Sequence, residues 1–315
     1  AVVSMFLGTE LTEILDAIES DTAYDAKEKE LLKIGVHVLP KFPKDTTDRN
    51  RTSPFAFTVN KFEFRAVGSN QSAARSNMVI NTIMADSYRY IADDILHNRE
   101  TLCLEDAIQK TVTDIVKKHN RIIFNGNGYT DEWLAEAEKR GLPNFKSTPE
   151  ALPHFIDEKN IELFTKHEVF TKEELFSRYE ILLEDYAKTL HIEAKTMEEM
   201  VQKDFLPSLF SYVNDLACTG SSKKELVPGI TTKAEEKLIT KLSGLADVIS
   251  DELDTLKDMI GTAEGMDDYL KAGTYYHDTI LTEMEKIRLA VNDAEVLIPE
   301  DYLPYPTYDA LLFYI

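Results

Sequence analysis

A short stretch of this 315-residue chain concentrates groups that could do chemistry. Within DRNRTSPFAFTVNKFEFRAVGSNQSAARSN, residues 48–77, the cations Arg49, Arg51, Lys61 and Arg65 lie around the carboxylate of Glu63. A carboxylate of this kind holds a divalent cation, and nearby cations hold phosphate or a substrate carboxylate, as nucleotide-dependent group transfer requires. The alternative is an ordinary cross-strand salt bridge.

The same stretch has the clearest strand pattern in the chain. Apolar residues alternate with polar or small ones over 55–59 and again over 62–64, and the phase slips between the two runs, as it does where a turn joins two short strands. Period-two alternation puts Lys61, Glu63 and Arg65 on one face and the aromatic rings on the other. The sequence therefore predicts a strand pair with one charged face and one apolar face.

The elements around this strand pair are helical by pattern. Apolar residues at helical spacing predict helices over 1–20, 72–98 and 104–119. The stretch FNGNGYTDEW, residues 124–133, contains two Asn-Gly pairs, and its Thr-Asp-Glu segment predicts the start of another helix. A glycine cluster can also cradle phosphate, but no P-loop lysine follows, so turn chemistry is favoured.

Longer helical stripes fill the second half of the chain. Steps of three and four predict helices over 176–201, 238–260 and 273–291, with the first ended or kinked near Pro207. The segment CTGSSKKELVPG, residues 218–229, is interpreted as a loop. Three long helices joined by short loops predict an antiparallel bundle.

A proline-rich connection, GLPNFKSTPEALPHF, separates these two halves and supplies a domain boundary. The predicted domains are 1–145, with the strand pair, and 146–315, with the bundle. The predicted fold class is mainly α with a small β element (α+β).

Composition limits the partners. The net charge of -21 opposes binding to nucleic acid or to an anionic membrane. No apolar run is long enough to span a bilayer and no signal peptide is recognisable, so a cytoplasmic protein is expected. Cys103 and Cys218 lack the spacing of a zinc site or a disulfide framework and are expected to be small buried residues.

Beyond these patterns, RNR followed by KFEFRAVGSNQSAARSN resembles the late catalytic segment of glutamine synthetases, in which Asn-Arg-Ser precedes a strand Arg/Lys-x-Glu-x-Arg. With FLGTELTEILDAIES, IIFNGNGYTDEWLAEAEKRGLP and the helical C-terminal region, essentially the whole chain is similar to the large type III branch. The resemblance implies synthesis of glutamine from glutamate, ammonia and ATP through γ-glutamyl phosphate. It also implies Mg²⁺ or Mn²⁺ between the nucleotide and glutamate.

The resemblance carries over to the strand pair residue by residue. Glu63 matches the glutamate that helps to hold the metal near the nucleotide phosphates. Arg65 matches the arginine that contacts the transferred phosphate and the substrate. Arg51 matches the arginine on the side of the glutamate carboxylate.

One position departs from the family pattern. Many members carry a further arginine five residues after the one matched by Arg51, and this chain has Ala56 there. Lys61 matches a basic nucleotide contact. Arg49 or Lys61 is therefore expected to take the role of the missing arginine.

The resemblance begins after the sheet strands that supply the remaining metal ligands of the family. The chain is therefore expected to be a C-terminal part of such an enzyme, inactive alone, with the intact protein forming a homo-oligomer. The competing hypothesis is a non-catalytic helical scaffold or assembly module in which the basic strand pair is a structural cluster of salt bridges.

Overall fold

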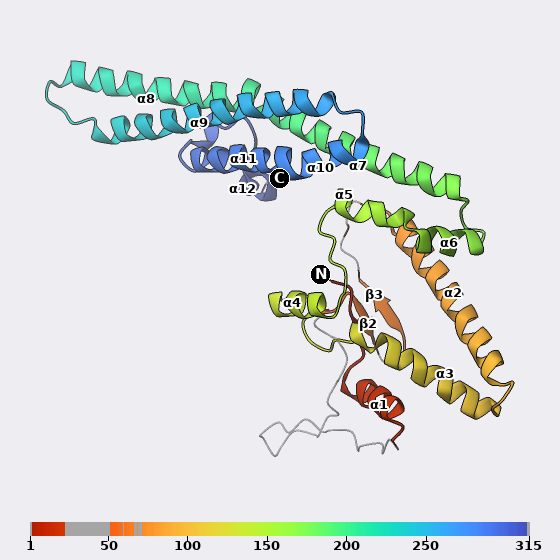
Figure 1. Ribbon diagram of the computed structural model, residues 1–315. Helices are drawn as coiled ribbons and strands as arrows, with labels where there is room; N and C mark the ends of the chain where they lie inside the picture. Colours follow the sequence, from red (N-terminus) through yellow and green to blue (C-terminus); the bar gives the residue numbers. More distant parts are fainter. Residues whose placement is uncertain (1, 23–50, 59, 66–67, 69–70, 314–315) are drawn as a thin grey trace, which may run out of the picture. The chain divides into compact units, whose positions relative to one another are not determined.

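The structure is a computed structural model that describes residues 2–22, 51–58, 60–65, 68 and 71–313. It is mainly helical with one small sheet, which confirms the predicted fold class (Figure 1). The chain divides into two compact units. Unit 1 comprises the described residues of Ala1–Phe145 and Glu162–Val169, and unit 2 comprises those of Lys146–Ile161 and Phe170–Ile315.

The sheet of unit 1 has three strands in the order β1-β2-β3. Strand β1 (Met5–Phe6) runs parallel to β2 (Phe55–Phe57), and β2 pairs antiparallel with β3 (Phe62–Phe64). The register sets Phe55 opposite Phe64 and Ala56 opposite Glu63. The predicted strand pair is therefore present, and a third strand that the pattern did not predict extends it.

The helix expected over 1–20 is wrong in its first part. Met5 and Phe6 form β1 by pairing with Phe55 and Ala56, and helix α1 (Thr9–Ser20) begins only after Gly8. The φ of Gly8 is 80°, in the region that favours glycine and lies outside the right-handed helix. This residue therefore separates strand from helix.

The next helices of unit 1 lie where the periodicity predicts them. They are α2 (Ala73–Asn98), α3 (Leu104–His119) and α4 (Asp131–Lys139), with the short 3₁₀ helix η1 (Asn120–Ile122) after α3. Side-chain caps fix their starts: Ser72 Oγ accepts from the backbone N–H of Ala74 at 3.2 Å. At α4 the hydroxyl of Thr130 accepts from the backbone N–H of Trp133 at 3.4 Å.

Short helices follow in the proline-rich connection. They are α5 (Thr148–Ala151), the 3₁₀ helix η2 (Leu152–Ile156) and α6 (Glu158–Lys166). The division between the two units passes through α6. Its last residue, Lys166, donates to Asp86 Oδ1 of α2 at 2.7 Å, which fixes this end of α6 to unit 1.

The bundle of unit 2 begins with a long helical run. Helix α7 (Lys172–Met200) continues through a π-helical turn, η3 (Val201–Phe205), into α8 (Leu206–Leu226). Pro207 is the second residue after this turn. Because proline has no N–H and its ring crowds the carbonyl four residues earlier, the wider π-helical turn accommodates it without ending the helix.

The loop predicted over 218–229 is wrong, because α8 is helical to Leu226. The apolar stripe stops before this segment, so periodicity does not show the helix. Lys223 and Lys224 form ion pairs with Glu235 and Glu236 at the start of the next helix, the second at 2.7 Å. Ion pairs to the neighbouring helix support this end of α8 in place of apolar contacts.

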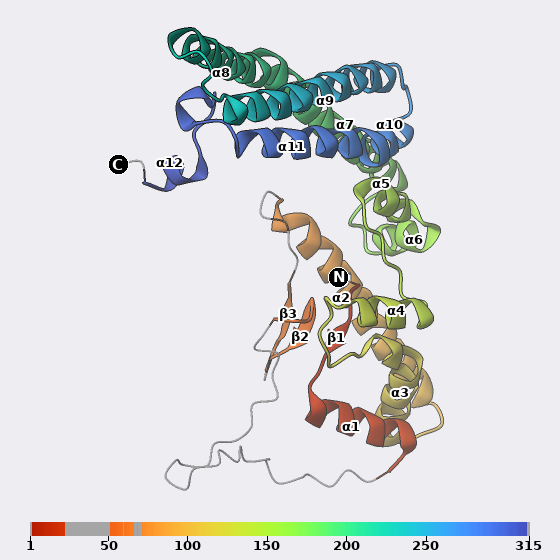
Figure 2. The same cartoon turned by 90° about the vertical axis from the view of Figure 1, so that its left-hand side faces the viewer.

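The bundle is completed by further helical elements and a tail. These are α9 (Lys233–Glu264), α10 (Tyr269–Tyr275), the π-helical turn η4 (Tyr276–Ile280), α11 (Leu281–Glu295), the 3₁₀ helix η5 (Glu300–Tyr302) and α12 (Tyr308–Phe313). Helix α9 lies along both α8 and α11 (Figure 2). Its central place explains why its buried stripe is the longest among the described helices.

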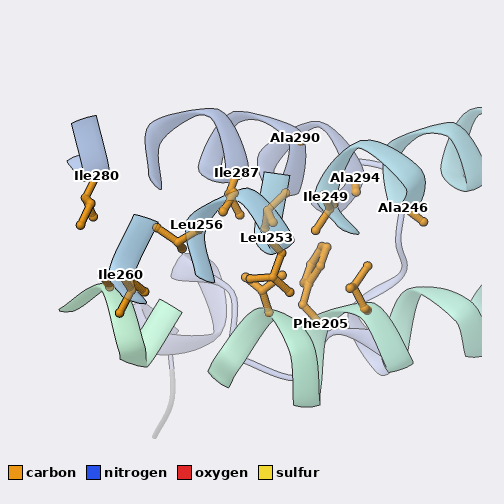
Figure 3. Packing of buried hydrophobic residues seen from close by; sticks show 14 of the residues in the cluster. Phe205, Ala246, Ile249, Leu253, Leu256, Ile260, Ile280, Ile287, Ala290 and Ala294 are labelled. Atoms are coloured by element: carbon orange, nitrogen blue, oxygen red, sulfur yellow. The ribbon is translucent and has the colours of Figure 1, made fainter. Parts of the chain in front are cut away.

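The bundle core is a continuous apolar cluster. Leu256 of α9 lies near Ile287 of α11, and Ile249 lies further along α9, with Phe205 of η3 below it (Figure 3). The first three are 0% exposed and Phe205 is 2% exposed. Burial of aliphatic side chains at helical spacing therefore holds unit 2 together.

Two expectations from the sequence concern membrane-spanning helices and the burial of the cysteines. No helix in the described ranges combines the length and the apolarity needed to cross a bilayer. The expectation that both cysteines are buried is wrong, because Cys103 and Cys218 are exposed. Cys103 is the N-cap of α3, where its sulfur accepts from the backbone N–H of Asp106 at 3.4 Å.

Candidate functional site

Strand β3 and the residues beside it bring three predicted site residues together. Lys61 Nζ lies 3.1 Å from Glu63 Oε1, and Arg65 Nη2 lies 3.0 Å from Glu63 Oε2. The hydroxyl of Thr58 donates to Glu63 Oε1 at 3.4 Å across the hairpin. Each carboxylate oxygen thus faces a different cation, on the shared face that period-two alternation predicts.

The charge of Glu63 is stabilised by these contacts. Hydrogen bonds from Arg65 and then from Lys61 hold the pKa of the Glu63 carboxyl below its usual range. The Glu63 side chain is 35% exposed and that of Arg65 is 17% exposed. The site therefore presents an ionised, accessible carboxylate next to a largely covered guanidinium group.

Arg51 lies on a segment that Arg65 holds from the side. Arg65 Nη1 donates to the carbonyl of Ser53 at 3.3 Å, and the backbone N–H of Arg65 donates to the carbonyl of Pro54 at 2.7 Å. Arg51 has a φ of 54°, a left-handed conformation that is uncommon for a residue with a side chain. The exposed Arg51 thus precedes a segment fixed to β3.

Arg49 and Ala56 are the two remaining positions that the sequence singled out. Arg49 lies outside the described residues. Ala56 is the central residue of β2, 0% exposed, and lies directly opposite Glu63. This position therefore supplies a small buried side chain and no cation.

A divalent cation would find only part of a site here. In the ranges that the structure describes, no group of three or more His, Cys, Asp or Glu side chains is arranged to hold a metal ion. Both oxygens of Glu63 already face cations, and Mg²⁺ prefers about six oxygen ligands. Glu63 fits as a single ligand and does not form a metal centre with the described residues.

Comparison with known proteins shows which family this chain resembles. The family profile described as "Glutamine synthetase C-terminal domain" matches residues 107–224. A glutamine synthetase of Butyrivibrio fibrisolvens is 41% identical over 99% of this chain. This chain is therefore similar to the C-terminal part of glutamine synthetases. The type III resemblance is confirmed as well, since a type-3 glutamine synthetase of Dictyostelium discoideum is 35% identical over 99% of the chain.

The match covers less than half of these relatives. The chain corresponds to 44% of the Butyrivibrio protein and 43% of the Dictyostelium protein. A glutamine synthetase of Bacteroides fragilis is 31% identical over 99% of this chain, which again corresponds to 44% of the relative. The matched region is the C-terminal part of a glutamine synthetase.

The other face of this strand pair is aromatic and partly open. The Phe55 ring stacks on Phe62 with centroids 5.6 Å apart, and Phe57 approaches Phe62 at 5.2 Å. Phe62 and Phe64 are nevertheless 49% and 41% exposed. Exposed aromatic side chains in a contiguous group mark a surface for contact with further protein.

The loop after α3 contributes contacts that the sequence analysis did not predict. Asn125 and Gly128, in the predicted turn, bond to the chain around Gly8 and to Thr52. The two Asn-Gly pairs indicated a turn, but nothing local indicated its distant partners. This loop connects the start of the chain with the segment that follows Arg51.

Unit 2 contains a separate groove of about 360 Å³ between α7 and α11. Its walls are mainly aliphatic, methionine and aromatic side chains, and Tyr305 of the tail closes one side. Tyr305 donates to Asp204 at 2.8 Å, and burial, reinforced by this hydrogen bond, raises the pKa of Tyr305 to about 12. The groove includes none of the predicted site residues.

Proposed function

We propose that the whole protein makes L-glutamine from L-glutamate, ammonia and ATP through γ-glutamyl phosphate, and that this chain supplies one wall of the active site. The observation that carries the proposal is the placement of Lys61 and Arg65 on either side of Glu63 in a chain similar to the C-terminal part of glutamine synthetases. Phosphoryl transfer depends mainly on positioning and on neutralising charge, which is what this face supplies.

The proposed roles follow the accessibility of each group. Arg65 contacts the transferred phosphate and the substrate, since its guanidinium lies beside the accessible carboxylate. Arg51 contacts the carboxylate side of glutamate. Lys61, 64% exposed, is able to reach the nucleotide, and Arg49 is the second candidate for that contact.

The proposed cofactors are ATP with Mg²⁺ or Mn²⁺. In the whole enzyme such an ion neutralises phosphate charge, and Glu63 would be one of its ligands. Because the described residues supply a single suitable carboxylate, the other ligands have to come from another part of the enzyme. The isolated chain is therefore expected to be inactive.

We assign residues 1–145 to the catalytic domain and residues 146–315 to a helical extension. Unit 1 contains the strand pair, and unit 2 contains a complete apolar core without any predicted site residue. The family profile spans both, from 107 to 224, so the two assignments belong to one continuous protein.

Replacing Glu63 tests the site directly. In a full-length enzyme carrying this segment, Glu63→Ala is expected to lower the rate of glutamine formation by about 100-fold or more, because it removes a charge from the reacting region. Subunit assembly, measured by light scattering, should not change. Wild-type turnover in this variant contradicts the site assignment.

Glu184 of α7 provides a matched control. Its carboxylate also contacts two donors, Lys188 Nζ at 2.6 Å and the Tyr269 hydroxyl at 3.1 Å. The side chain is 31% exposed, close to the 35% of Glu63. Glu184→Ala removes a comparable surface ion pair far along the chain and should leave turnover unchanged.

The scaffold hypothesis predicts a different result from the same variants. If the cluster around Glu63 is only structural, Glu63→Ala alters stability and not turnover. Deleting 170–315 then removes the assembly role. The self-contained core of unit 2 suits such a role, and we propose that the intact enzyme is a homo-oligomer to which this bundle contributes.

A further inference from the structure

The loop of residues 124–130 is fixed to the first strand of unit 1. The backbone N–H of Phe124 donates to the carbonyl of Met5 at 2.9 Å. Asn125 Oδ1 accepts from the N–H groups of Leu7 and Gly8 at 3.1 and 3.0 Å. These bonds tie the beginning of the loop to the end of β1.

The far end of the loop is fixed as well. Trp133, in the first turn of α4, is 0% exposed, and its ring stacks on Phe124 with centroids 4.2 Å apart. Its indole N–H donates to the carbonyl of Val2 at 3.3 Å. The loop is therefore held at both ends and has little freedom to move.

Gly128, in the middle of this loop, contacts the segment that follows Arg51. Its N–H donates to the carbonyl of Thr52 at 2.7 Å. A Cβ atom at this position would lie 3.0 Å from the Thr52 carbonyl oxygen and 3.5 Å from Pro54 Cδ. Any side chain at residue 128 would therefore push against the backbone of residues 52–54.

The backbone at this contact is in a costly conformation. Arg51 has a φ of 54°, which a residue with a Cβ seldom adopts, and such strain persists only where the surroundings impose it. On one side Gly128 holds the Thr52 carbonyl, and on the other Arg65 holds the Ser53 carbonyl at 3.3 Å. Both contacts hold the backbone that directly follows Arg51.

We propose that Gly128 is a positioning residue, which sets the backbone at Thr52 and through it the guanidinium of Arg51 for the substrate carboxylate. The inference rests on the proposed function, in which Arg51 contacts glutamate. A guanidinium group recognises a carboxylate through paired hydrogen bonds of fixed geometry, so a displacement of the backbone weakens the contact. ATP binding, assigned to other residues, does not depend on Gly128.

The experiment compares Gly128→Ala, Arg51→Ala and the double variant in a full-length enzyme carrying this segment. Gly128→Ala is expected to raise the KM for glutamate by between about 10- and 100-fold and to leave the KM for ATP near the wild-type value. In the Arg51→Ala background the same change should add little, because the group that it displaces is already absent.

Gly261→Ala in α9 is the matched control, since a Cβ there meets nothing within 4 Å. It should leave both KM values unchanged. If Gly128→Ala does not yield folded protein, Asn125→Ala loosens the loop without adding an atom against Thr52. It should raise the KM for glutamate by a smaller factor.

The outcomes separate the two proposals. A normal KM for glutamate in Gly128→Ala, or in Asn125→Ala where the first variant does not fold, overturns the positioning role. So does an equal rise in both KM values, or an effect fully additive with Arg51→Ala. A normal KM for glutamate in Arg51→Ala itself instead removes the site assignment on which the inference rests.

Discussion

Each of the two units of this chain is stabilised internally by a different kind of contact. Unit 2 has a continuous core of aliphatic side chains, in which residues such as Ile249 and Leu256 are 0% exposed. Among the described residues of unit 1, one small buried apolar cluster comprises Val2, Trp133 and Ala137. Its longest helix, α2, buries only Thr82 and Asn98, both polar.

This difference shows which unit needs further protein around it. A helix of 26 residues with two buried polar side chains gains little from apolar burial. The same unit exposes Phe62 and Phe64 and, on α2, Ile83 at 46%. Unit 1 thus has apolar surface for more protein to cover, whereas unit 2 is built around a continuous buried core of its own. The proposed active site lies in the unit that depends on its surroundings.

The largest effect on this difference between the units is expected from a cavity in the core of the bundle. Leu256→Ala removes a fully buried side chain from α9 and should lower the free energy of unfolding of unit 2 by about 2–5 kcal/mol. Helical circular dichroism in a denaturant titration measures this. Trp133, the chain's single tryptophan, lies in unit 1, so its fluorescence transition should stay in place.

A matched control lies on the same helix. Val248 of α9 is 47% exposed, so Val248→Ala should change the unfolding free energy by less than about 0.5 kcal/mol. Should Leu256→Ala move the Trp133 transition as far as the helical one, the two units unfold together. The two units would then differ in the contacts that they bury but not in their unfolding transitions.

A smaller effect is expected from the polar contacts of unit 1. Asn98 is 6% exposed; its Nδ2 donates to Thr111 Oγ1 and to Asp94 Oδ2, both at 3.1 Å, and its Oδ1 accepts from Lys110 Nζ at 2.8 Å. Asn98→Ala removes these three hydrogen bonds of α2 and α3, while Thr111 still donates to Asp94 Oδ2 at 2.6 Å. The free energy of unfolding of unit 1 should fall by about 1–3 kcal/mol, measured by Trp133 fluorescence.

Asn214 of α8 supplies the control for this change. It is exposed and donates a single long hydrogen bond, to Asp215 at 3.5 Å. Asn214→Ala should leave both transitions in place. An equally stable unit 1 in Asn98→Ala would mean that apolar contacts, rather than this network, join α2 to α3.

The sequence predicted elements that depend on near neighbours. Helices over 72–98 and 104–119 were predicted because their apolar period and their ends are local properties. The strand at Met5 was missed because only its pairing with Phe55, far along the chain, makes it a strand. The end of α8 was missed because ion pairs to α9, and no apolar stripe, support it.

In the candidate site too, features of a single strand were predicted from the sequence and contacts between distant segments were not. Period-two alternation placed Lys61, Glu63 and Arg65 on one face, since alternation is a property of the strand itself. The bond from Gly128 to Thr52 joins two loops distant in sequence, and no local pattern encodes it. The roles assigned to these residues stay predictions.

The smallest effect concerns a buried charge in the bundle. Lys286 Nζ of α11 lies 2.8 Å from Glu283 Oε2 and 3.7 Å from Glu252 Oε2 of α9, and the Glu283 side chain is 2% exposed. The hydrogen bond with Glu283, together with burial, raises the pKa of Glu252. Burial raises the pKa of Glu283, but the hydrogen bonds with Glu252 and Lys286 outweigh it, so this pKa is lowered. Apolar packing therefore does not describe the bundle completely.

These two shifts act in opposite directions on stability. Above the unfolded pKa of about 4.3, the folded state binds more protons at Glu252, so this group makes the bundle less stable as pH rises toward its raised pKa. Below about 4.3, the contribution of Glu283 is lost as pH falls through its lowered pKa. Their sum is greatest near pH 4.3.

Glu283→Gln removes both contributions and so isolates them. The difference in unfolding free energy between the wild-type chain and this variant, measured by circular dichroism from about pH 3.5 to 7, should peak near pH 4.3 and decline on both sides. Glu285→Gln, on the exposed face of α11, makes the same amide substitution outside the core and serves as the control for it. A flat difference for Glu283→Gln would contradict the prediction, because it would mean that folding does not shift the pKa of either carboxyl.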